Sequence, residues 1–357
     1  MANYYYSITI ENEILSNYVK YDVLDNLIHT HYQNSKANNL NIYIDIMSML
    51  TDIILDERLI YTIDDKAVFA STIINMCMHY KRFFLRKNVQ CEFFLIFGTN
   101  TPAINNSLVY KYNAKFKYLY SISRFKRYIE MNMKLLEYIV QFIPSIYYFD
   151  AKDNETSAFI KYVMEYFGTP EDYENLIISK DILSFQLVSD TCKVLRPKKY
   201  KGVDSSYIVD IYNIWNVLIN NIRHIRSEEI VSSGINLHPR LFTNVLAMSG
   251  VPERHIVSLT STSHVLKSLL NNSININSVG YNQSSLNKIL DIINKGVLEN
   301  LGNDVEDRWK SINADFQCET IRNNPIYSQL VLKDYDDTAA LMRLVSKYFD
   351  KLPLHLS

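Results

Sequence analysis

Three acidic residues each follow a short apolar run in this chain of 357 residues. Asp45 lies at the end of NIYIDI, Glu155 opens the stretch after SIYYF, and Asp181 follows LIIS by one residue. In a parallel sheet, functional residues gather at the carboxyl ends of the strands, so we expect these acids at one edge. Carboxylates gathered there would bind a divalent metal ion. The alternative is that each acid is only a helix N-cap.

Short apolar runs bounded by polar residues predict the strands that would position these acids. The predicted strands are 41–46, 91–97, 145–149, 174–179 and 192–195. Helical spacing predicts helices at 64–87, 155–167, 208–226, 239–249, 263–271, 284–299 and 336–350. Strands that alternate with helices favour an α/β fold with a mostly parallel central sheet and helices on both faces.

Composition limits the function classes. The net charge of −1 excludes a wholly basic nucleic-acid binder, so any basic surface must be local. The four cysteines lie far apart, which predicts neither a zinc site nor a disulfide framework and favours a reducing compartment. With no leader and no long apolar run, we expect a cytoplasmic protein without a membrane partner. The 27 tyrosines, with abundant Asn and Ile, suggest an AT-rich genome, either viral (a phage, for example) or bacterial.

Four segments, in this order, resemble the flap endonuclease and 5′-3′ exonuclease family. They are YIDIMSML at 43–50, FGTNTPAINNSLVYKYNAKFK at 97–117, ETSAFI at 155–160 and IISKDILSFQLVSDTCKVLRP at 177–197. A fifth segment, 239–270, is similar to the family's helix-hairpin-helix region. The resemblance implies a PIN-like nuclease core at 1–207 with a helical arch at about 103–145. It also implies a helical region with a helix-hairpin-helix-like element at 208–300, followed by a C-terminal helical tail at 301–357.

The resemblance places Asp45, Glu155 and Asp181 on metal-binding positions of the family. Other metal-binding positions of the family hold Gly98, Ser157, Ala158, Leu183, Val251 and Arg254. Two-metal hydrolysis needs a crowd of carboxylates around the scissile phosphate. We therefore expect a degenerate site that holds one Mg²⁺ or Mn²⁺, or no metal.

The arch segment is rich in basic residues with tyrosines between them. Its candidate DNA-binding residues are Lys111, Lys115, Lys117, Arg124, Lys126, Arg127 and Tyr112. A second basic cluster is Arg196, Lys198, Lys199 and Lys201. Lys and Arg neutralise phosphates, and aromatic rings stack on unpaired bases. The alternative is a solvated helix face whose tyrosines pack on the core.

Three functions follow as hypotheses. The first is a catalytically degenerate relative that binds flap, branched or single-stranded DNA, within a viral replication or repair assembly and its protein partners. The second is a diverged but active Mg²⁺-dependent 5′ nuclease that retains Asp45, Glu155 and Asp181. The third is a scaffold subunit that reuses the fold and binds no nucleic acid.

Overall fold

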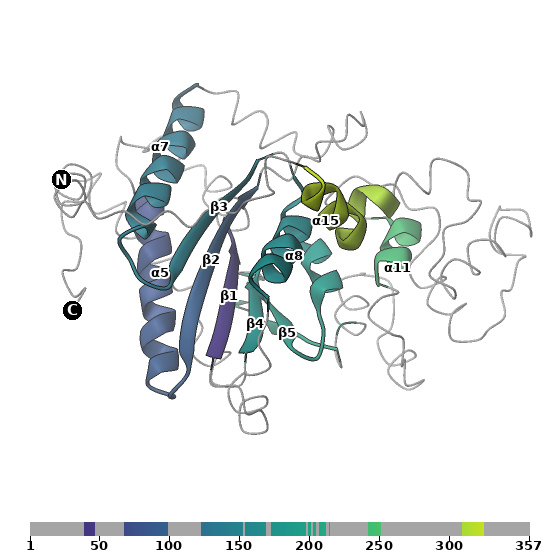
Figure 1. Ribbon diagram of the computed structural model, residues 1–357, viewed down its shortest axis with the longest axis horizontal. Helices are drawn as coiled ribbons and strands as arrows, with labels where there is room; N and C mark the ends of the chain where they lie inside the picture. Colours follow the sequence, from purple (N-terminus) through teal and green to yellow (C-terminus); the bar gives the residue numbers. More distant parts are fainter. Residues whose placement is uncertain are drawn as a thin grey trace, which may run out of the picture.

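The computed structural model shows a central sheet with helices packed on both faces (Figure 1). It describes residues 39–46, 68–98, 123–152, 154–168, 173–197, 199–200, 203–204, 207–211, 214, 242–250 and 309–324. No helix within these ranges is long and apolar enough to cross a membrane.

Six strands form the central sheet, in the order β3-β2-β1-β4-β5-β8. They are β1 Asn39–Asp45, β2 Gln90–Gly98, β3 Ile146–Lys152, β4 Tyr173–Ile178, β5 Cys192–Arg196 and β8 Tyr207–Val209. The first five run parallel, so their carboxyl ends meet at one edge, which we call the carboxyl edge. Apolar runs of this kind suit strands covered on both faces. The five predicted strands and the mostly parallel α/β fold are confirmed.

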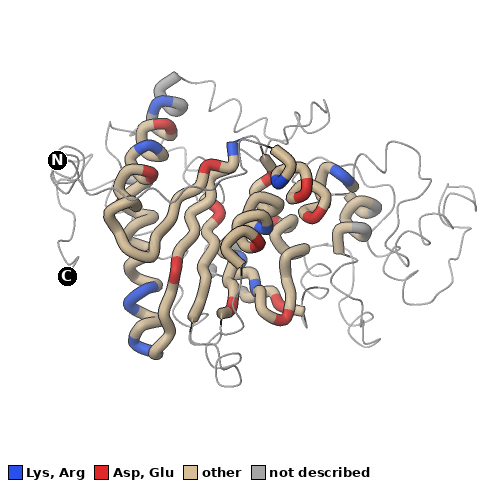
Figure 2. The backbone as a smooth tube through the Cα atoms, in the orientation of Figure 1, with Lys and Arg blue, Asp and Glu red and all other residues tan. Residues whose placement is uncertain are grey.

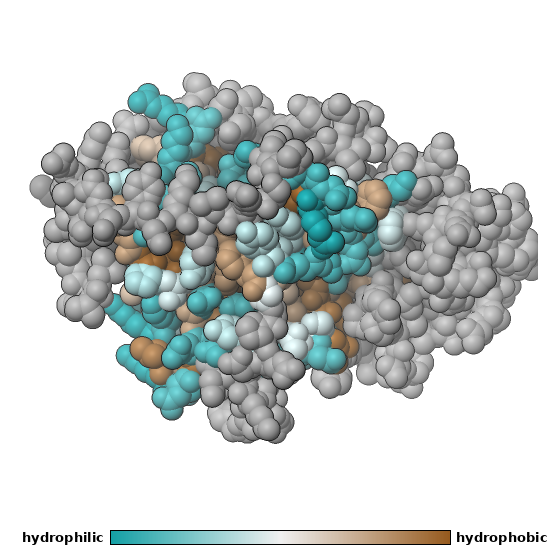
Figure 3. All heavy atoms as spheres, viewed as in Figure 1, coloured by the Kyte–Doolittle hydropathy of each residue, from teal (hydrophilic) through white to brown (hydrophobic). Residues whose placement is uncertain are grey.

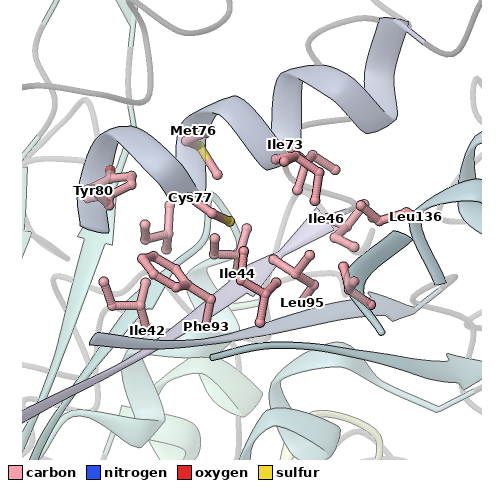
Figure 4. Close-up of a cluster of buried hydrophobic side chains, with 14 of the residues drawn as sticks. Ile42, Ile44, Ile46, Ile73, Met76, Cys77, Tyr80, Phe93, Leu95 and Leu136 are labelled. Carbon is pink, nitrogen blue, oxygen red and sulfur yellow. The ribbon is translucent and has the colours of Figure 1, made fainter. Parts of the chain in front are cut away.

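Two long helices cover one face of the sheet. They are α5 Val68–Leu85 and α7 Ser123–Val140. Ile44 and Leu95 from adjacent strands point toward α5, which contributes Ile73 and Cys77 to the same buried cluster (Figure 4). Asn132 of α7 accepts a hydrogen bond of 3.0 Å from the Ala70 backbone of α5. Each helix is therefore fixed against its neighbour as well as against the sheet.

A second core lies on the opposite face of the sheet. Its helices are α8 Thr156–Phe167, the 3-10 helix η3 Ile182–Leu187, α11 Phe242–Ser249 and α15 Ala314–Arg322. Tyr43 and Phe94 stack beneath them with ring centroids 4.8 Å apart. Burial raises the pKa of the Tyr43 hydroxyl well above its usual range. Two elements of this second core, α8 and η3, begin just beyond the carboxyl ends of β3 and β4.

Helix α15 packs directly on α8. Cys318 of α15 is buried between them, while Lys161 forms an ion pair of 2.7 Å with Asp315. A second ion pair joins Arg322 to Glu165. Charged and polar residues gather on the surface over these two helices (Figure 3). Helix α15 falls inside the predicted tail 301–357, yet it belongs to the second core. The domain boundaries at 207 and 300 stay predictions.

The sixth strand differs from the sequence expectation. Residues from 208 onward were expected to be helical, but β8 extends to Val209 and pairs antiparallel with β5. Ile208 packs against the core under α5 and α7, and Val209 is buried in the core under α8. Successive residues of β8 therefore pack into opposite cores. Pairing with β5 also gives β8 backbone hydrogen bonds, which favour a strand here over the helix that the apolar spacing predicted. A small hairpin, β6 Lys199–Tyr200 and β7 Val203–Asp204, precedes it.

Candidate functional site

Asp45 and Ser179 lie side by side at the carboxyl edge. Asp45 is the last residue of β1, and Ser179 directly follows β4, the strand paired with β1. The Ser179 hydroxyl donates a hydrogen bond of 2.7 Å to Asp45 Oδ2. The Asp45 side chain is 1% exposed, so this hydrogen bond offsets part of the cost of burying its charge.

Asp181 is connected to the same pair through its backbone. Its N–H donates to Ser179 Oγ at 3.0 Å. Its side chain accepts a hydrogen bond of 3.1 Å from the Leu183 N–H and is the N-cap of η3. Ser179 thus links the Asp45 carboxylate to the backbone of Asp181, while the Asp181 carboxylate has the capping role that was the alternative interpretation.

Glu155 occupies the corresponding position at the start of α8. Its Oε2 accepts a hydrogen bond of 3.0 Å from the Ala158 N–H and another from the Ser157 hydroxyl. It is the N-cap of α8 and is 2% exposed. Ser157 and Ala158 lie where the family resemblance has acids, and here both donate to Glu155. The Ala158 N–H in the first turn of α8 therefore has its hydrogen-bond acceptor within the protein.

Close packing between β2 and α8 fills the neighbouring part of the edge. A Cβ added at Gly98, the last residue of β2, would lie 2.7 Å from Thr156 Oγ1 and 3.3 Å from the Ala151 Cβ. Contacts below about 3 Å are strongly repulsive, so Gly98 lets α8 approach the strand. The resemblance has an Asp at this position, and a carboxylate side chain does not fit there unless Thr156 moves.

These contacts bear on metal binding. Across the ranges that the structure describes, no group of three or more His, Cys, Asp or Glu side chains is placed to hold a metal ion. The Asp45 carboxylate accepts from Ser179, the Asp181 carboxylate caps η3, and Glu155 caps α8. The described residues do not fit the carboxylate cluster that two metal ions need. The metal-binding role assigned to Asp45, Glu155 and Asp181 stays a prediction.

The basic arch lies mostly outside the described residues. Lys111, Tyr112, Lys115 and Lys117 fall there, as do the predicted helix-hairpin-helix-like element and Arg254. Arg124, Lys126 and Arg127 belong to the first turns of α7.

The exposed face of α7 can be described from Arg127 onward. Arg127 and Lys134 alternate there with Glu130 and Glu137. Figure 2 shows basic and acidic residues interspersed along α7. This part of α7 is therefore mixed in charge, so basic excess in the arch depends on residues before Arg127.

Sequence reasoning missed two basic residues at the carboxyl edge. Lys152 is the last residue of β3 and is exposed, and Lys180 follows Ser179 and is partly exposed. Arg196, from the second basic cluster, ends β5, and its guanidinium lies 5.5 Å from the centre of the Phe185 ring. These residues could have been identified from the sequence, because each one closely follows a predicted strand.

Comparison with models of known families finds no match for this chain, and neither does comparison with curated proteins. Among solved structures, it is similar to a bacteriophage T5 protein crystallised with metal ions. The two are 13% identical over 87% of this chain and 96% of that one, with a TM-score of 0.42. It is also similar to a bacteriophage T5 flap endonuclease pseudo-enzyme–product complex with DNA and metal ions. That pair is 11% identical over 86% and 99% of the two chains, with a TM-score of 0.48.

A third similar structure is a T5 5′-exonuclease with bound zinc, 13% identical over 81% of this chain and 90% of that one, with a TM-score of 0.44. At these values no residue role passes from those proteins to this chain. The structure is thus similar in overall arrangement to 5′ nucleases of bacteriophage T5, and its own contacts define its site.

Proposed function

We propose that this chain is a catalytically degenerate relative of flap endonucleases and 5′-3′ exonucleases that binds branched or single-stranded DNA. The observation that carries the proposal is that the acidic side chains at the carboxyl edge already accept hydrogen bonds from other groups of the protein. Glu155 and Asp181 cap helices, Asp45 accepts from Ser179, and Thr156 fills the space beside Gly98. Carboxylates engaged in this way are poor candidates to hold the two metal ions of the family's hydrolysis.

DNA binding is supported by the basic residues of the arch and of its first described turns. Arg127 is exposed on α7, and the sequence places Lys111, Lys115 and Lys117 with Tyr112 just before it. Lys and Arg supply the phosphate contacts, and tyrosine rings supply stacking for unpaired bases, about 1–3 kcal/mol each. We propose a role in a viral replication or repair assembly in the cytoplasm of the host cell, alongside protein partners.

One observation favours an active, diverged 5′ nuclease as the second candidate. Asp45 ends β1, and Asp181 follows the neighbouring strand β4, with its backbone N–H bonded to the Ser179 hydroxyl that donates to Asp45. One Mg²⁺ or Mn²⁺ needs only one or two protein carboxylates, with water as its remaining ligands. These two residues are the ones that would hold such an ion, and its chemistry would be activation of a water near the scissile phosphate.

The test measures binding and cleavage of a fluorescent 5′-flap DNA together. We expect binding in EDTA and no cleavage in Mg²⁺ or Mn²⁺. The matched variants are Asp45→Asn with Asp181→Asn, which keep the side-chain shape, and Asp190→Asn, which changes an exposed acid at the opposite edge. Metal-dependent cleavage that disappears only in the first variant would establish the active nuclease. Failure to bind flap, branched or single-stranded DNA would favour the scaffold hypothesis instead.

A further inference from the structure

Three strands carry a basic residue at or just beyond their carboxyl ends. Lys152 ends β3, Arg196 ends β5, and Lys180 comes two residues after the last residue of β4. Lys152 is exposed, and the other two are partly exposed. Because these strands are parallel, the three cations share the carboxyl edge with Asp45.

Strand register gives their spacing. Ile44 pairs with Ile178 and Ile178 with Leu195, so Asp45, Ser179 and Arg196 form one row across β1, β4 and β5. At about 4.8 Å per strand, the backbones of Asp45 and Arg196 are about 10 Å apart, and β3 and β5 are about 19 Å apart. Lys152 pairs with Gly98, two residues beyond the level of Asp45, so it projects further from the sheet.

Two of the acids at this edge are buried. Asp45 and Glu155 are 1% and 2% exposed, and both accept hydrogen bonds from protein groups. Asp181 is partly exposed and caps η3, and Asp150 is exposed and accepts from the Lys152 backbone N–H at 2.8 Å. Two carboxylates are therefore buried within the fold, whereas all three basic residues reach the surface, where Asp150 and Asp181 also lie.

Arg196 is also held in place. Its guanidinium lies over the Phe185 ring, which packs against Phe242 at 5.9 Å between ring centres. Contact with an aromatic face restricts the position of the guanidinium. Planar guanidinium donors match phosphate oxygens well.

We propose that the carboxyl edge binds the phosphodiester backbone of DNA directly, through Lys152, Lys180 and Arg196. This inference rests on the proposed function, since it names the surface by which the bound DNA is held. Cationic side chains then occupy the edge at which a metal-dependent nuclease would hold its ions, and the contact needs no divalent metal.

The experiment compares DNA affinity across a range of salt concentrations, in EDTA. The edge variant combines Lys152→Asn, Lys180→Gln and Arg196→Gln, with Asn at 152 because that residue has φ 51°. The control variant combines Arg82→Gln, Arg86→Gln and Lys87→Gln, which removes the same charge from exposed residues at the end of α5, by the opposite edge. Each phosphate contact contributes about one unit to the slope of log affinity against log salt.

We expect the edge variant to lose about two to three units of slope for every DNA sequence, and the control to keep the wild-type slope. If the wild type binds and both variants match its slope, the edge proposal is overturned while DNA binding stands. If the wild type binds no DNA, both proposals fall. Should the triple variant not fold, Lys152→Asn alone changes an exposed side chain and is expected to lose about one unit. An unchanged slope in that variant counts against the edge.

Discussion

Gln186 in η3 is hydrogen-bonded to the backbone of Ala314, 128 residues further along the chain. The Ala314 N–H donates to Gln186 Oε1 at 2.8 Å, and the Thr243 hydroxyl donates to the same oxygen at 3.0 Å. Gln186 Nε2 in turn donates to the Ile312 carbonyl at 2.9 Å. One amide therefore joins η3, α11 and α15, at the other end of η3 from the Asp181 cap.

Replacing Gln186 should loosen all three elements together. We expect Gln186→Leu to lower the free energy of unfolding by about 2–4 kcal/mol, because it leaves the Ile312 carbonyl and Ala314 N–H without their partner. Thr243→Val, which removes one of the three hydrogen bonds, is the control and should cost about 1 kcal/mol. Urea unfolding measures both. Equal losses in the two variants would contradict this account.

Gly98 should not tolerate a side chain while Thr156 is present. Its added Cβ would meet Thr156 Oγ1 at 2.7 Å, so we expect Gly98→Ala to cost about 1–3 kcal/mol through overpacking. Thermal unfolding of Gly98→Ala, Thr156→Ala and the double variant forms a cycle. The double variant should lose less than the sum of the two single variants. Additive losses would show that the two positions do not compete for space.

Lys193 and Glu174 form a buried ion pair between β5 and β4, with Nζ 2.8 Å from Oε2 and side chains 7% and 11% exposed. Lys193→Met leaves a buried carboxylate without its partner and should cost about 3–5 kcal/mol. The double variant Lys193→Met with Glu174→Leu should recover much of that loss. Arg322→Met breaks a more exposed pair and is expected to cost less. A double variant no more stable than Lys193→Met would refute the argument.

Stability should fall at alkaline pH through the buried thiols. Burial raises the pKa of Cys192 from 9.0 to about 12. The folded protein therefore keeps a proton that the unfolded chain releases, so this stability is complete below pH 9 and is lost as the pH rises toward 12. Cys192→Ala should reduce the slope of unfolding free energy against pH by at most about 1.4 kcal/mol per unit. Denaturant midpoints between pH 9 and 12 measure this, and an unchanged slope would exclude the thiol as the cause.

The strands were predictable because each is a short apolar run with polar ends, as at Asn39–Asp45. Helix α8 was equally clear, and the structure begins it at Thr156, one residue after the prediction. Strand β8 was missed because three residues carry too little periodicity, and its partner β5 determines its conformation. Helix α15 lies in the tail that was expected to be helical, but it was not assigned individually, because its exposed face is charged and its buried face is recognisable only against α8.

The candidate site was predictable in position but not in its bonding. Sequence order placed Asp45 at the end of one strand and Asp181 shortly after another, and in the structure Asp45 ends β1 and Asp181 caps η3. It could not show that Ser179 would donate to Asp45, because that depends on β4 lying beside β1. The packing of Thr156 against Gly98 likewise depends on the approach angle of α8.

The position of α15 also has a consequence for how the chain folds as it is made. Cys318 of α15 contacts Glu165 of α8, 153 residues earlier, and the apolar side of α8 is shared with residues of α15. Domains fold as their residues emerge from the ribosome, at about 5–20 residues per second. The α8 side of the sheet must therefore wait, partly uncovered, for several seconds or more after β5 has emerged. During that interval, we expect the nascent chain to be a client for chaperones that bind exposed apolar surface.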